Sequence, residues 1–279
     1  MTAQGGSRDE GETLRIGIIG GGFMGEAFLR GLLRAGVAKP ADIAVAEVVE
    51  ARRVVLGEHG VRVTDDAESA SIGAEVVLLA VKPQDIPNLA AQLQGSLPKD
   101  AVLISIAAGV KLDDVRRYSG HRACVRVMPN LPAAVGEGAA VYYPSSEVTE
   151  TQRRRVETVL RAVAQAVVEV HDDDAVDLAT AVHGSGPAYV YLFIEAMVDA
   201  AVRLGMKRPD ATALVLATVS GSARYAIETG RHPAELRNAV TSPGGTTAAA
   251  LAELEAAGFR TAIDSAIEAA YDRAHELGE

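Results

Sequence analysis

Short apolar runs alternate with helical stretches along the first half of this chain. The runs cover residues 16–19, 43–46, 76–81, 102–106 and 124–127, and the helical stretches between them cover residues 25–35, 48–58 and 86–93. Strands without polar alternation are buried on both faces, and the intervening helices can provide that cover. The pattern therefore predicts an α/β fold with a parallel, doubly wound sheet.

The second half of the chain is predicted to be helical. Thr149-Glu150-Thr151-Gln152 has the form of a capping box that opens a helix to about Gln165, and residues 167–170 are expected to form a last strand. From His171 onward, the predicted helices cover residues 187–204, 209–228, 233–240, 247–257 and 259–277. We expect a domain boundary at residues 170/171, and a disordered tail at the polar, Gly-rich residues 1–13.

A glycine-rich loop follows the first predicted strand. Gly20-Gly21-Gly22-Phe23-Met24-Gly25 matches G-x-G-x-x-G and precedes the helix expected over residues 26–35. In that context Gly20 permits the tight turn, Gly22 lets the backbone approach a pyrophosphate, and Gly25 lets the helix pack closely on the sheet. The helix N-terminus offers unpaired N–H groups to the phosphates. The loop predicts that residues 14–170 form a Rossmann domain that binds NADH or NADPH.

The sequence leaves the choice between these cofactors open. Glu47 ends the second strand, 22 residues after Gly25, where a carboxylate accepts hydrogen bonds from the ribose diol of NAD. Arg52 and Arg53 follow closely and could instead bind the 2′-phosphate of NADP. All three residues also suit a solvated helix start.

Two further strand ends lie where a doubly wound sheet binds its ligand. Ala80-Val81-Lys82-Pro83 follows one strand, and Lys82 is either a charge at the cofactor phosphates or a solvated loop lysine. After the next strand, the small residues Ala107 and Ala108 leave room for a nicotinamide ring.

Two glycine loops interrupt the helical half. His183-Gly184-Ser185-Gly186-Pro187 and Thr241-Ser242-Pro243-Gly244-Gly245-Thr246-Thr247 place glycines and hydroxyls just before a helix N-terminus. Such an arrangement holds a small anion through backbone N–H groups and a hydroxyl. The alternative is helix capping by Thr246 or Thr247. Two such loops beside a dinucleotide domain favour a small carboxylate substrate.

Two predicted helices are unusually apolar. Residues 211–223 carry no charge, and neither do residues 188–194. A helix that is apolar on all sides must be buried on all sides, and a small helical domain cannot easily surround two of them. A tight monomeric core is one explanation, and we prefer a homodimer in which these helices pack across the interface.

Composition excludes several classes of function. The net charge of −10 and the 4% of aromatic residues argue against a nucleic-acid or anionic-membrane partner. The single cysteine, Cys124, excludes an intramolecular disulfide and a Cys-rich metal site, and its apolar neighbours suggest a buried, inert thiol. No apolar run reaches the ~18 residues of a membrane span, and the N-terminus lacks a signal-peptide pattern. We expect a cytoplasmic protein without a metal.

The ordered motifs resemble those of the pyrroline-5-carboxylate reductase family over residues 14–278. The strongest likeness lies in residues 233–255, around Val240-Thr241-Ser242-Pro243-Gly244-Gly245-Thr246-Thr247. Residues 80–83, 105–109, 128–130 and 184–189 match further family motifs in the expected order. The glycine loop alone fits many dehydrogenases, whereas this ordered set fits few.

The resemblance implies that NADPH or NADH reduces the cyclic imine 1-pyrroline-5-carboxylate to L-proline, in a homodimer within a larger homo-oligomer. The implied cofactor residues are Gly20, Gly21, Gly22, Phe23, Met24, Gly25, Ala80, Val81, Lys82, Pro83, Ala107 and Ala108. Glu47 and Arg52 join them from the dinucleotide-binding pattern alone, since Glu47 stands where many family members carry hydroxyl or phosphate-tolerant residues. The implied substrate residues are Ser185, Ser242, Gly244, Gly245, Thr246 and Thr247, with Thr247 as the catalytic residue that hydrogen-bonds the ring nitrogen. His183 replaces a small hydroxyl residue common in the family; it either packs under its loop or assists protonation of the imine.

Two rival functions fit less well. A reductase of β-hydroxy acids needs a lysine acid–base group in the helical half, where the only lysine, Lys207, lies in a predicted loop. A non-catalytic dinucleotide sensor has no need of the intact loop at residues 242–247.

Overall fold

The computed structural model describes residues 13–278. The expected tail at residues 1–13 lies outside this range except for Thr13, whose hydroxyl donates a hydrogen bond to Asp42. Contacts divide the chain into two compact units. The first, the sheet unit, comprises the residues up to Gly184 together with Tyr271 onward, and the second, the helical unit, comprises Ser185–Ala270. The predicted domain boundary at 170/171 stays a prediction.

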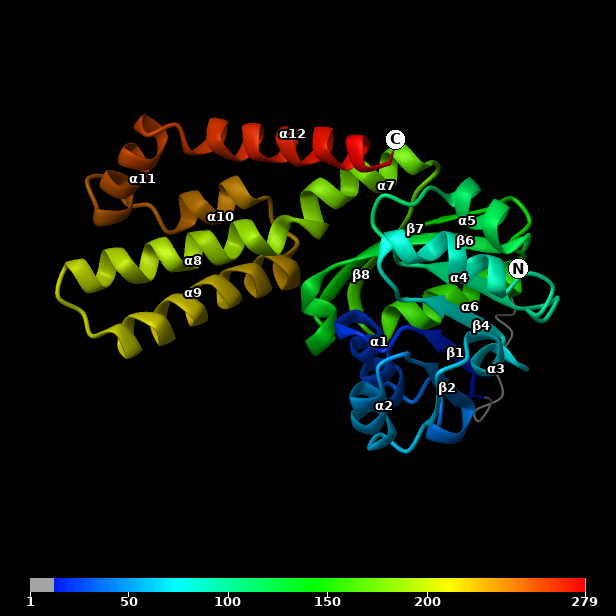
Figure 1. The fold of residues 1–279 in the computed structure, drawn as a ribbon. Helices are drawn as coiled ribbons and strands as arrows, with labels where there is room; N and C mark the ends of the chain where they lie inside the picture. Colours follow the sequence, from blue (N-terminus) through cyan, green and yellow to red (C-terminus); the bar gives the residue numbers. More distant parts are fainter. Residues whose placement is uncertain (1–12, 279) are drawn as a thin grey trace, which may run out of the picture. The chain divides into compact units, whose positions relative to one another are not determined.

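Within the described residues, eight strands form one sheet (Figure 1). They are β1 (Ile16–Ile19), β2 (Ile43–Ala46), β3 (Arg62–Thr64), β4 (Val76–Leu79), β5 (Val102–Ser105), β6 (Cys124–Pro129), β7 (Gly138–Pro144) and β8 (Ala164–Glu169). Their order is β3-β2-β1-β4-β5-β6-β7-β8. The sequence crosses from one side of β1 to the other between β3 and β4, so the carboxyl ends of β1 and β4 form the switch point of a doubly wound sheet.

The predicted parallel sheet holds for β1 to β6, with one departure beyond them. β7 pairs with β6 in antiparallel register, Val127 opposite Tyr142. β8 pairs with β7 in parallel, so the last two strands both run against the first six. The pattern of apolar runs did not reveal β7, because residues 138–144 begin with small residues and end at Pro144.

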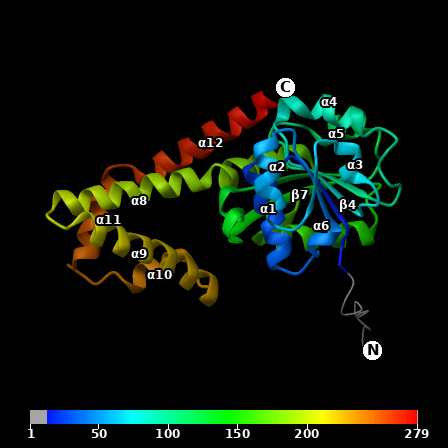
Figure 2. The same cartoon turned by 60° about the horizontal axis from the view of Figure 1, so that its bottom comes forward.

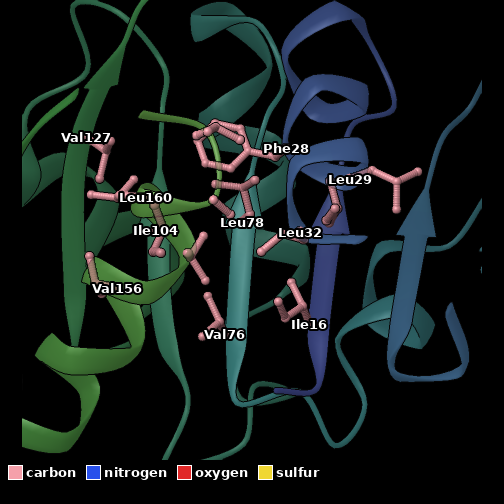
Figure 3. Close-up of a cluster of buried hydrophobic side chains, with 14 of the residues drawn as sticks. Ile16, Phe28, Leu29, Leu32, Val76, Leu78, Ile104, Val127, Val156 and Leu160 are labelled. Carbon is pink, nitrogen blue, oxygen red and sulfur yellow. The ribbon is translucent and has the colours of Figure 1, made fainter. Parts of the chain in front are cut away.

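Helices cover both faces of the sheet (Figure 2). They are α1 (Phe23–Arg34), α2 (Glu50–Gly57), α3 (Ala67–Ser71), α4 (Ile86–Gln92), α5 (Leu112–Ser119), α6 (Glu150–Arg161) and α7 (Asp173–Ala179), with short 3₁₀ turns at Pro40–Asp42, Pro83–Asp85 and Leu131–Val135 and a π turn at Thr180–Gly184. Alternation along β1 directs Ile16 and Ile18 to one face and Ile19 to the other. The first face packs against α1 and α6, as Figure 3 shows for Phe28 and Leu160, and the second packs against α3, α4 and α5.

The capping box at the start of α6 is confirmed. Thr149 accepts from the backbone N–H of Gln152, and the Gln152 side chain accepts from the backbone N–H of Thr149. The helix ends at Arg161 rather than near Gln165, because Ala164 already pairs with Gly138 in the sheet.

The helical unit consists of helices with few buried side chains. They are α8 (Gly186–Arg203), α9 (Arg208–Thr229), α10 (Pro233–Ala239), α11 (Thr246–Ala256) and α12 (Phe259–Leu277), the last of which ends in the sheet unit. α8 and α9 lie side by side (Figure 1) and bury Val198, Ala211 and Val215 between them. Among residues 13–278, no helix has the length and apolar character to cross a bilayer.

Candidate functional site

The glycine loop joins β1 to α1 at the carboxyl edge of the sheet. Gly20 has φ +104°, and a Cβ there would lie 2.5 Å from the carbonyl oxygen of Ala80. A Cβ on Gly25 would lie 2.0 Å from the carbonyl oxygen of Gly20. Neither position can hold a larger residue without moving the backbone. These contacts explain why the turn and the helix packing require glycine.

Gly22 differs from the other two glycines. It is exposed, and a Cβ placed on it would meet nothing within 4 Å. Gly22 is also the N-cap of α1, and no side chain caps this helix start. The first N–H groups of α1 are therefore open to an anion at the positive end of the helix dipole. The fold leaves the space and the donors that a pyrophosphate needs.

Glu47 and Arg52 both contact the glycine loop. Glu47 accepts from the backbone N–H of Gly21 at 2.8 Å, and Arg52 donates to the Gly21 carbonyl at 2.6 and 3.2 Å. Arg52 also donates to Glu26 at 2.7 Å. This hydrogen bond lowers the pKa of the Glu26 carboxyl below its usual value. Both residues therefore lie at the loop and help to fix its conformation, while their predicted contacts with the cofactor stay predictions.

A cavity of about 160 Å³ opens at the carboxyl ends of β1, β2 and β4. Its lining is Ile19, Gly20, Ala46, Glu47, Val48, Asp65, Asp66, Ala67, Val81, Leu89 and Gln92. A larger hollow of about 480 Å³, next to Leu14 and Glu75, lies at the opposite, amino ends of the strands. Doubly wound sheets bind ligands at the carboxyl ends, so the smaller cavity is the candidate cofactor site.

The later strand ends supply small side chains at the same edge. Lys82 is exposed at the start of a 3₁₀ turn, which leaves both of its sequence interpretations open. Ser105 and Ala107 are buried, while Ala108 is exposed. The segment after β5 therefore places two alanines and Gly109 in succession at this edge.

In the helical unit, the loop before α11 has an uncapped helix start. Gly244 has φ +66°, and Gly245 donates its N–H to the carbonyl oxygen of Ser242 at 3.1 Å. The N-cap is Gly245, and no side chain caps α11. The alternative in which Thr246 or Thr247 caps the helix is thus wrong, because both residues already lie inside it. The first N–H groups of α11 remain open to an anion.

The other loop is anchored by His183. Its Nδ1 lies 2.6 Å from the carbonyl oxygen of Ala179, and its Nε2 lies 2.8 Å from that of Met128. Asn130 donates to the carbonyl oxygen of His183 at 3.1 Å. With both ring nitrogens against backbone oxygens, His183 packs under its loop, as the sequence favoured. Ser185 follows as the N-cap of α8 and makes no side-chain cap.

Comparison with known proteins decides the family. A family model described as "Pyrroline-5-carboxylate reductase dimerisation" matches residues 173–277, and one described as "NADP oxidoreductase coenzyme F420-dependent" matches residues 15–109. The pyrroline-5-carboxylate reductase of Synechocystis sp. is 44% identical over 268 residues, which cover 96% of this chain and 99% of that protein. The chain belongs to the pyrroline-5-carboxylate reductase family.

Solved reductases share the fold along nearly the whole chain. The reductase from Coxiella burnetii has a TM-score of 0.90 at 36% identity, covering 96% of this chain and 100% of that one. The enzyme from Plasmodium falciparum, solved with NADP bound, has a TM-score of 0.85 at 30% identity, covering 95% and 98%. The predicted Rossmann sheet followed by a helical dimerisation region is confirmed, as is an NAD(P)-dependent oxidoreductase that self-associates. The residue roles stay predictions.

One polar cluster of this reductase was missed from the sequence. Arg126, in the middle of β6, is 3% exposed and contacts Asp177 at 2.5 Å and Asp173 at 2.6 Å. Asp173 also accepts from the backbone N–H of Leu112. The neighbouring Asp172 caps α7 by accepting from the backbone N–H of Ala175. A charged residue inside the apolar run 124–127 was the signal for a buried partner.

Proposed function

We propose that this chain reduces 1-pyrroline-5-carboxylate to L-proline with NADH or NADPH. The observation that carries the proposal is the 44% identity to a pyrroline-5-carboxylate reductase over 99% of that protein's length. Similarity on that scale includes both the glycine loop of the sheet unit and the Gly244–Thr247 loop of the helical unit. The first suits a dinucleotide, and the second suits a small carboxylate.

The sheet unit would hold the cofactor. The open N-terminus of α1 takes the pyrophosphate, and the Ala80–Pro83 turn supports it from the neighbouring strand. The small side chains of Ala107 and Ala108 leave space for a flat ring. When bound, the reduced nicotinamide would supply from its C4 a hydride to the carbon of the protonated imine, whose C=N π electrons would pass to nitrogen and leave the neutral ring amine of proline.

The helical unit would hold the substrate. The uncapped start of α11, with Ser242, Gly244, Gly245 and Thr246, offers N–H and hydroxyl donors to the carboxylate. Thr247 hydrogen-bonds the ring nitrogen and orients the imine carbon, and Ser185 adds a hydroxyl from the start of α8. Orientation supplies most of the rate, since a well-placed pair gains on the order of 7–11 kcal/mol from proximity.

Replacing Thr247 with alanine tests this assignment. The loss of one hydrogen bond to a charged group, about 1.5–3 kcal/mol, lowers kcat/KM roughly 10- to 150-fold. Cofactor affinity, measured by titration calorimetry, stays unchanged. Thr229→Ala, which removes an exposed hydroxyl from α9, serves as the matched control and keeps wild-type kinetics.

Two outcomes would contradict the proposal. Wild-type kinetics in Thr247→Ala would remove this residue from the site. Failure of the wild-type protein to oxidise NADH or NADPH with the imine, beside a panel of hydroxy acids, would reject the reaction itself. A larger homo-oligomer and a cytoplasmic location also stay predictions.

A further inference from the structure

The cavity beside the glycine loop has an acidic rim. Glu47, Asp65 and Asp66 line it, and among residues 13–278 no lysine or arginine belongs to its lining. Asp66 caps α3 by accepting from the backbone N–H groups of Glu68 and Ser69. The mouth of the cavity therefore repels a second anionic group.

Glu47 is fixed in a geometry that suits a diol. One carboxylate oxygen accepts from Gly21 at 2.8 Å, and the other accepts from the N–H of Val49 at 2.9 Å. Each carboxylate oxygen has two lone pairs, so each keeps one for a further donor. Two neighbouring hydroxyl groups can donate to these two acceptors at once. A phosphate, which carries no proton to donate to them at neutral pH, cannot.

The nearby arginines are already engaged. Arg52 donates to the Gly21 carbonyl and to Glu26. Arg53 donates from Nη1 to the backbone carbonyls of Glu47 and Val48, both at 2.9 Å. The Nε and Nη2 groups of Arg52 and the Nη1 group of Arg53 would have to release the loop and the strand end before they could donate to a 2′-phosphate. The guanidinium groups of Arg52 and Arg53, which could offset the Glu47 carboxylate, therefore hold the glycine loop and the end of β2 in place.

We propose that Glu47 makes this reductase select NADH over NADPH. The selection rests on the proposed cofactor site at the end of β2, where the ribose of the adenosine half lies in doubly wound folds. The ribose diol of NADH donates to Glu47, whereas the 2′-phosphate of NADPH meets its carboxylate and those of Asp65 and Asp66.

Binding measured without substrate tests this inference. Titration calorimetry on the wild-type protein is expected to give a dissociation constant at least tenfold lower for NADH than for NADPH. Glu47→Gln keeps an oxygen acceptor for Gly21 but removes the charge, and Glu47→Ser also removes bulk. Each substitution is expected to lower the ratio of the NADPH dissociation constant to the NADH dissociation constant at least tenfold. Glu50→Gln, an exposed carboxylate in the first turn of α2 outside the cavity lining, is the control and keeps the wild-type ratio.

The outcomes separate this inference from the proposed reaction. Equal or tighter binding of NADPH by the wild-type protein, with the imine still reduced, would overturn the selection alone. An unchanged ratio in both Glu47 variants would remove Glu47 as its cause. Absence of binding of either dinucleotide would overturn both the selection and the proposed reaction.

Discussion

The sheet unit and the helical unit bury their apolar side chains to different extents. In the sheet unit, central residues such as Ile18, Val77 and Leu103 have no exposed surface. In the helical unit, Leu192 is 66% exposed, Leu214 57% and Ile227 81%. Each buried leucine or isoleucine contributes about 1.5–3 kcal/mol, so the two units must be stabilised differently. The sheet unit is stabilised by contacts within the chain, and the helical unit needs another copy.

Polar groups show the same difference. The sheet unit buries the Arg126 guanidinium together with Asp177, whereas the ion pair of Arg224 and Glu228 on α9 lies at the surface. A buried pair is strongly destabilising to break, because the remaining charge has lost its water. An exposed pair contributes little. Substitutions of the same kind should therefore have unequal effects in the two units.

The largest expected effect follows from removing Asp177. Asp177→Ala leaves the buried Arg126 with Asp173 as its only carboxylate among the contacts described here. We expect a loss of about 3 kcal/mol in the free energy of unfolding, or a fall in Tm of roughly 6–10 °C. Thermal melts followed by circular dichroism measure it.

Glu228→Ala is the matched control for this substitution. It removes the carboxylate of an exposed i,i+4 pair and is expected to change the stability by less than about 0.5 kcal/mol. Equal shifts in the two variants would show that the cluster around Arg126 does not stabilise the sheet unit more than a surface pair does.

The sequence predicted elements best where burial alone decides them. The strands Ile16–Ile19 and Ile43–Ala46 have the bounds that their apolar runs indicated, because both of their faces are covered. β3, with exposed Arg62 among its three residues, lies at the sheet edge and carried no such signal. The antiparallel β7 forms by pairing with β6 and β8, and the local pattern of residues 138–144 does not predict such pairing.

The candidate site was predictable only in part for a similar reason. The glycine loop carries its own backbone requirement, so Gly20 and Gly25 could be assigned from the sequence. The contacts of Arg52 with Gly21 and Glu26 join residues 26–31 positions apart, and no spacing rule foretells them. The anchoring of His183 by Met128 depends in the same way on tertiary packing.

A smaller effect is expected from a charge on the exposed apolar surface of α9. Leu214→Glu should weaken self-association by about 2 kcal/mol, or roughly 30-fold in the dissociation constant, because a leucine is lost from the interface and a charge is buried there. Sedimentation equilibrium at several protein concentrations measures it. The control, Ile72→Glu, alters a side chain that is 71% exposed in the sheet unit and should leave the assembly unchanged. If both variants associate like the wild type, the surface of α9 around Leu214 is not the interface.

The smallest expected effect concerns the thiol inside the sheet unit. Burial raises the pKa of Cys124 to about 12, whereas an unfolded cysteine titrates near ~8.5. Between these values the unfolded chain releases a proton that the folded chain keeps. The free energy of unfolding therefore keeps its full value below about pH 8.5 and falls as the pH rises toward 12.

From pH 8 to pH 9.5, the stability of the wild type should fall by about 1 kcal/mol more than that of Cys124→Ala, which lacks the thiol. Denaturant unfolding at the two pH values measures the difference. Parallel losses in the two proteins would mean that Cys124 is reached by solvent, and the contrast between a closed sheet core and an open helical surface would weaken accordingly.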